Sequence, residues 1–119
     1  MGQASVQRRN GRDPQLYSKA RARACAEVKR THPWICALCG LPIPRDANHQ
    51  TDRLGHTVDE IQPRSLNGSA SDLANLRPMH RTCNSARQNG HITPDMVTRQ
   101  RTAVLAITNA ATGTTSRNW

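Results

Sequence analysis

Cys36-Ala-Leu-Cys39 and His80-Arg-Thr-Cys83 are the two stretches that decide the fold of this chain. In each, two metal-binding residues are separated by two others, and the two pairs come from distant segments. Zinc takes thiolate and imidazole ligands in closed tetrahedral sites, commonly as two short-spaced pairs. We therefore expect a structural zinc ion bound by all four residues, without which the domain would not fold. Buried cysteines beside a surface histidine are the alternative, and the matching intervals argue against it.

The composition indicates why the chain needs such a metal. Its 119 residues leave room for one domain, with no Phe, two Trp and one Tyr to fill a core. A core this thin usually needs a metal or disulfides. Nothing resembles a signal peptide, and the cysteine spacing favours metal ligation over disulfides. Cys25 has no partner at this spacing, so we read it as a core or surface residue.

The charge of the chain favours a polyanionic partner. The net charge is +9, and only Lys19 and Lys29 among the basic residues are lysines. Arginine pairs with phosphate through a planar fork, which makes nucleic acid the natural partner. Residues 31–70 carry a net −1, whereas residues 1–30 carry +6 and residues 71–119 carry +4. An acidic middle suits a divalent cation and basic flanks suit phosphate, although uneven solvation charge is the simpler alternative. No apolar run approaches the roughly 20 residues of a membrane span.

Local patterns predict an α+β domain over residues 13–108, with its core motif at 34–90. Asp13-Pro14 begins a helix that runs to about Arg30. One face of that helix is apolar, and the other is basic through Lys19, Arg23 and Arg30. Strand-like segments follow at 56–61 and 73–79, then helices at 82–89 and from Thr93 to about Ile107. We expect residues 1–12 to be a disordered basic arm and 109–119 a flexible tail.

An acidic pair, Asp59-Glu60, ends the first predicted strand. Adjacent residues in a strand point to opposite faces, so both side chains reach one site only near a strand end or a bulge. Taken alone, the pair reads as a solvated acidic pair.

The combined pattern resembles the HNH endonucleases, whose fold is the zinc-stapled ββα-metal module. Asp59-Glu-Ile-Gln-Pro63 is similar to the Asp-His-Ile-x-Pro element of that family, and Asn75-Leu76 to its Asn-Leu element. His80-Arg-Thr-Cys83-Asn84 is similar to the final metal pair and the residue after it. More narrowly, the chain resembles small stand-alone HNH proteins of tailed bacteriophages, which also end near Ser-Arg-x-Trp, as residues 116–119 do.

This resemblance implies the roles of the acidic pair and its neighbours. Asp59 and Asn84 would bind the catalytic cation, which would be Mg²⁺, Mn²⁺ or Ni²⁺. Asn75 would brace the loop between the strands and hold the base in place. The base is usually a histidine, and this chain has Glu60 there. Glutamate is the weaker base near neutral pH, but it can position water or ligate metal. His56 is an alternative base, about 13 Å away along the strand.

The sequence therefore predicts a metal-dependent endonuclease that nicks or cleaves double-stranded DNA. The resemblance implies a role in phage genome processing or packaging with terminase subunits, in the host cytoplasm. A non-catalytic zinc-bound DNA-binding module is the rival from another class, and a host-directed toxin or restriction factor is a third reading. The arginines expected to contact DNA are Arg23, Arg30, Arg77, Arg81 and Arg87.

Overall fold

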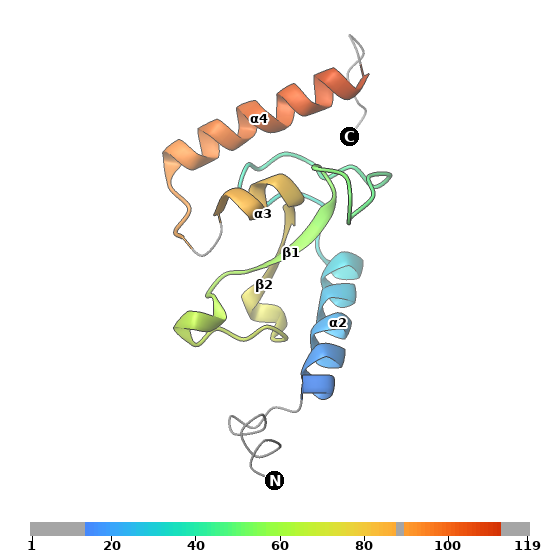
Figure 1. Cartoon of the computed structure of the whole chain (residues 1–119), viewed down its shortest axis with the longest axis vertical. Helices are drawn as coiled ribbons and strands as arrows, with labels where there is room; N and C mark the ends of the chain where they lie inside the picture. The colour runs from blue at the N-terminus through green and yellow to red at the C-terminus, as the bar shows by residue number, and fades with distance from the viewer. Residues whose placement is uncertain (1–13, 88–89, 113–119) are drawn as a thin grey trace.

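The expected α+β architecture is confirmed in the computed structural model, which describes residues 14–87 and 90–112. The described residues form three α-helices and a two-stranded antiparallel sheet, with α4 lying beyond α3 as seen from the sheet (Figure 1). The elements are α2 (Pro14–Thr31), β1 (His56–Glu60), the 3₁₀ turns η1 (Arg64–Leu66) and η2 (Leu73–Asn75), β2 (Leu76–His80), α3 (Arg81–Arg87) and α4 (Pro94–Thr112). The predicted basic arm, the Asp13 cap and the last seven residues of the predicted tail lie outside the described residues.

Two elements differ from the sequence-based expectation. The second strand begins at Leu76 rather than at 73, because Asp72 accepts a hydrogen bond from the Ala74 amide and caps η2. Helix α4 continues to Thr112, beyond the expected end near Ile107, so residues 109–112 are helical and not tail. No Gly or Pro interrupts this segment, and its alanines are the strongest helix formers.

The hairpin register determines which side chains share a face. Asp59 lies directly opposite Arg77, and His56 lies opposite His80. Successive residues of β1 alternate between the two faces. Thr57 and Asp59 therefore point towards α3, while Val58 and its neighbours at 56 and 60 point towards α2.

Two separate clusters form the core. Ala24 and Val28 of α2 pack on Leu76 of β2 and Val58 of β1. The larger cluster surrounds the cysteines and is covered by α4, whose Val104 is fully buried. None of the helices in the described ranges is both long and apolar enough to cross a membrane.

Candidate metal centre and nuclease face

The structure brings together the four residues expected to bind zinc. One ligand atom from each of them lies within 4.8 Å of all the others, and all four residues are buried. In a tetrahedral site with Zn–S bonds of about 2.3 Å, the ligand atoms are just under 4 Å apart, so a small contraction suffices. The first pair sits in a tight turn: the Gly40 amide donates to the Cys36 carbonyl, and Gly40 has a φ of 75°. The cluster of Cys36, Cys39, His80 and Cys83 is therefore compatible with a structural zinc ion.

The imidazole of His80 is oriented for ligation through Nδ1. Its Nε2 lies 2.9 Å from the Pro42 carbonyl, to which it can only donate. Its Nδ1 faces the sulfur atoms, 3.3 Å from Cys39 Sγ and 3.9 Å from Cys83 Sγ. A carbonyl on the far nitrogen fixes the tautomer and the ring orientation of a metal-binding histidine.

The side chains of this cluster shift one another's pKa values. Hydrogen bonds from the Cys39 and Cys83 thiols hold the pKa of Cys36 far below its usual range. Although burial lowers the pKa of His80, the neighbouring sulfur atoms of Cys36 and Cys39 raise it to about 9. Cysteine and histidine must lose their protons to bind a metal, so the affinity of the cluster for a cation falls as the pH falls.

A second group of side chains lies between β1 and α3, and Asp59 is at its centre. This carboxylate is 4% exposed. Its Oδ2 accepts from Arg77 Nε at 2.9 Å, and its Oδ1 accepts from Arg87 Nη1 at 2.7 Å. Arg87 also donates to the carbonyls of Glu60 and Ile61, which ties α3 to the end of β1.

Asn84 lies on the same face as Asp59. Its Nδ2 donates to Thr57 Oγ1 at 3.2 Å, and Thr57 in turn donates to the Met79 carbonyl. Because the sequence predicts nuclease chemistry at Asp59 and Asn84, we call this group the nuclease face, defined by Thr57, Asp59, Arg77, Asn84 and Arg87. Carboxylate and amide oxygens are ligands of Mg²⁺ and similar hard cations, so the donor set fits such an ion by its chemistry. Because both oxygens of Asp59 accept from guanidinium groups, a cation there requires at least one arginine to move.

Residues 36–90 match the family model of the HNH endonucleases. The matched residues, which we call the HNH segment, include both the zinc ligands and the nuclease face. Neither the comparison with curated proteins nor that with solved structures gave a match. The match supports nuclease activity with metal binding and DNA as the class of substrate.

Glu60, expected as the general base, lies at the end of β1 on the side opposite Asp59. Its carboxylate pairs with Arg21 of α2 at 3.2 Å, and its side chain is 16% exposed. The register has no bulge at this position, so the side chains of residues 59 and 60 diverge. To act together with Asp59, Glu60 would have to leave Arg21 and turn around the strand end.

His56, the alternative base, is buried against Trp34 with ring centroids 4.4 Å apart. Neither ring nitrogen has a hydrogen-bond partner among the described residues. Burial, together with the positive charges of Lys29 and Arg45, lowers its pKa to about 4. On this evidence of packing and charge, His56 belongs to the interior beside α2 and not to the nuclease face.

Asn75 of the HNH segment spans the loop between the strands. Its Nδ2 donates to the carbonyls of Gln62 and Ser69, and its Oδ1 accepts from the Gln62 amide. The loop also depends on Gly68, where an added Cβ would lie 1.6 Å from the Gln62 carbonyl oxygen. These bonds fix the path of the chain directly after Glu60.

The five arginines expected at DNA lie in two different environments. Arg23, Arg30 and Arg81 are exposed. Arg77 and Arg87 instead turn inward to Asp59, with 23% and 6% of their side chains exposed. Sequence reasoning missed Arg21, which bridges Glu60 and the Ala70 carbonyl. Its place on the apolar side of α2, next to Ala20 and Ala24, is the signal that could have revealed an inward-facing arginine.

Proposed function

We propose that this protein hydrolyses phosphodiester bonds of double-stranded DNA with the help of a divalent cation. The observation that carries the proposal is that Asp59 and Asn84, from separate segments, share one face beside the zinc cluster. Oxygen donors on β1 and on α3, held together beside a structural metal, would form a scaffold suited to a hard cation.

In this proposal, Asp59 and Asn84 hold the cation and Glu60 positions or deprotonates the attacking water. The cation would stabilise charge on the phosphate and the leaving oxygen. Asn75 keeps the segment after Glu60 in place. Of the two guanidinium groups on Asp59, that of Arg77 is the more exposed, so Arg77 is the one that turns towards a phosphate when the carboxylate binds a cation.

A second candidate function is supported by a specific observation on the nuclease face. Both carboxylate oxygens of Asp59 accept from arginines, and Glu60 pairs with Arg21 on the other side of the strand. In that arrangement neither acidic side chain is free for a cation or for water. The same fold would then act as a zinc-bound DNA-binding module that recruits another enzyme.

For the biological setting, we propose processing of phage DNA for packaging, with terminase subunits as partners, in the cytoplasm of the host. This part of the proposal rests on the sequence resemblance alone. It concerns the partner and not the chemistry.

Plasmid nicking separates the two candidate functions. Zinc-loaded protein is incubated with supercoiled plasmid, either without added cation or with Mg²⁺, Mn²⁺ or Ni²⁺. The nuclease produces nicked or linear plasmid only when a cation is added. Retarded but intact plasmid under every condition would instead favour the DNA-binding module.

A further inference from the structure

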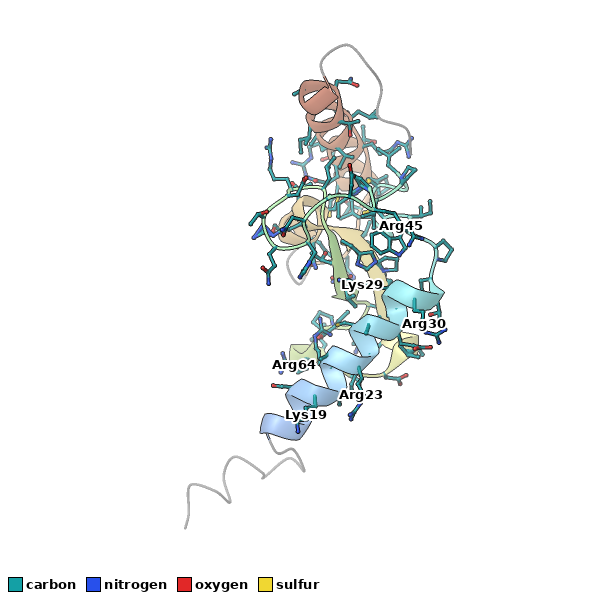
Figure 2. All side chains as sticks on the ribbon, turned by 90° about the vertical axis from the view of Figure 1, so that its right-hand side faces the viewer. Lys19, Arg23, Lys29, Arg30, Arg45 and Arg64 are labelled. Atoms are coloured by element: carbon teal, nitrogen blue, oxygen red, sulfur yellow. The ribbon has the colours of Figure 1, made fainter. Side chains whose placement is uncertain are left out.

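A basic surface runs along the side of α2 that faces away from the sheet. At roughly 100° per residue, Lys19, Arg23 and Arg30 fall within about 40° of one another around the helix axis. Val28, at the centre of the buried face, lies about 180° from Lys19 by the same count. Figure 2 looks onto this side, with α2 in front and the three labelled side chains spaced along it.

The surface is extended beyond the end of α2 by a packed contact. Trp34 Nε1 donates to the Lys29 carbonyl at 2.9 Å, which fixes the indole against the last turn of the helix. The Arg45 guanidinium stacks over that ring, 4.3 Å from its centroid. Arg45 is thereby placed next to Lys29, above the helix in Figure 2. We call Lys19, Arg23, Lys29, Arg30 and Arg45 the α2 basic surface.

Most of this charge is not neutralised within the protein. Lys19, Arg23, Lys29 and Arg45 make no ion pair in the part of the chain that the structure describes. Only Arg30 is paired, with Glu27 one turn earlier, and both side chains are exposed. An unneutralised row of cations can replace the counterions condensed on a nucleic acid, and the release of those counterions favours binding.

The spacing of the row fits the backbone of a nucleic-acid duplex. Lys19 and Arg30 are separated by about 16 Å along the helix axis, the rise of about five base pairs. Apart from Arg45, the residues of this surface lie outside the HNH segment, and α2 packs on the face of the sheet opposite to that of Asp59. Because a helix with its side chains is about 10 Å thick, a duplex resting on it cannot also reach Asp59 directly.

We propose that the α2 basic surface binds the sugar–phosphate backbone of duplex DNA, at a site separate from the nuclease face. The choice of duplex DNA as the partner rests on the proposed function, while the location and charge of the binding site rest on the row of cations. Contacts to the sugar–phosphate backbone carry no sequence information directly, so the surface would hold DNA independently of sequence. It would keep the protein on DNA while another segment of the duplex is at the nuclease face.

The chain offers a matched control for the test. Asp95 and Arg99 form an exposed acid–arginine pair on α4, comparable with the Glu27–Arg30 pair on α2. Arg23→Gln and Arg99→Gln lower the net charge equally, and Glu27→Gln and Asp95→Asn raise it equally, so each comparison tests where the charge lies. Glutamine in place of arginine also keeps helix propensity nearly constant.

The experiment measures binding of the full chain to a short duplex by fluorescence anisotropy over a range of salt, without added divalent cation. Arg23→Gln should weaken binding and make the fall of log K with log salt less steep, by about 0.9 in the slope. Arg99→Gln should leave the slope unchanged. Glu27→Gln releases Arg30 and should raise affinity about threefold, unlike Asp95→Asn.

Equal effects of Arg23→Gln and Arg99→Gln, or of Glu27→Gln and Asp95→Asn, would overturn the proposal, because net charge alone would then explain the binding. Tighter binding to phosphatidylserine vesicles than to duplex at the same salt, lost in Arg23→Gln, would reassign the surface to lipid. Because no cleavage is measured, a failure of the nuclease proposal leaves these outcomes unaffected.

Discussion

Arg87 donates from Nη1 to Oδ1 of Asp59 at 2.7 Å, and both side chains are almost completely buried. This pair joins α3 to β1 in the same way that the zinc cluster joins α3 to the first cysteine pair. Asp59 therefore has a structural partner in addition to its proposed role as a cation ligand. Removing one member of a buried ion pair leaves the other charge uncompensated, at a cost of about 3–5 kcal/mol.

Asp59→Ala is accordingly expected to lower the free energy of unfolding by about 3 kcal/mol, measured by urea denaturation of zinc-loaded protein. Asp59→Asn keeps an acceptor for Arg87 and should cost less. Unchanged stability in Asp59→Ala would show that the Asp59–Arg87 pair is not maintained in solution. If Asp59→Ala does lose this stability, a lack of cleavage by the variant does not by itself identify Asp59 as a metal ligand, because destabilisation alone could explain it.

The sequence predicted the elements and the clustering of the four candidate zinc ligands well, because both depend on local rules. Pro at the start of a helix and two matched ligand pairs are readable without tertiary contacts. The partners of Asp59 and Glu60 were not predicted, because they come from β2, α3 and α2 and depend on which face of β1 each residue takes. Arg87 was expected at DNA, since a buried arginine and an exposed one look the same in a sequence.

The zinc cluster predicts different outcomes for two cysteines of the same chain. Cys83→Ser should lose zinc and cooperative unfolding, since the metal supplies folding free energy that the thin core lacks. Cys25→Ser should retain both, because Cys25 is half-buried and outside the cluster. Metal analysis and thermal unfolding measure the difference. Parent protein that unfolds cooperatively with no zinc would end this interpretation.

His56 predicts a loss of stability in mild acid. Its pKa is about 4 in the folded chain, below the ordinary 6.5, so only the unfolded chain takes up the proton between these values. The contribution of neutral His56 to the free energy of unfolding is complete above pH 6.5. It is lost as the pH falls to 4, which lowers the free energy of unfolding by at most about 3 kcal/mol. His56→Phe keeps a ring beside Trp34 and should flatten this part of the stability profile. Parallel profiles for parent and variant would mean that His56 does not stay neutral. The comparison also removes the contribution of zinc release, which both proteins share.

If Glu60 is the base, two substitutions at this position should have different effects on the rate of cleavage. Glu60→Gln retains a hydrogen bond to Arg21 and should slow cleavage by about a hundredfold or more. Glu60→His should preserve or raise the rate near neutral pH, since imidazole is the better base there. Asp95→Asn, which also removes an arginine-paired carboxylate, is the control. Cleavage by Glu60→Gln at the parent rate would exclude Glu60 as the base.

The most direct test of the account is cation-dependent nicking by Asn84→Ala compared with Asn109→Ala. Asn84 is half-buried, and among the described residues its side chain hydrogen-bonds only to Thr57, so its loss should leave folding and zinc content unchanged. Asn109 is exposed on α4 and serves as the matched control. With Mn²⁺ added, we expect Asn109→Ala to nick supercoiled plasmid as the parent does, and Asn84→Ala to be slower by about a hundredfold. Equal nicking by both variants, or nicking that does not depend on added cation, would contradict the assignment of cleavage to the Asp59–Asn84 face.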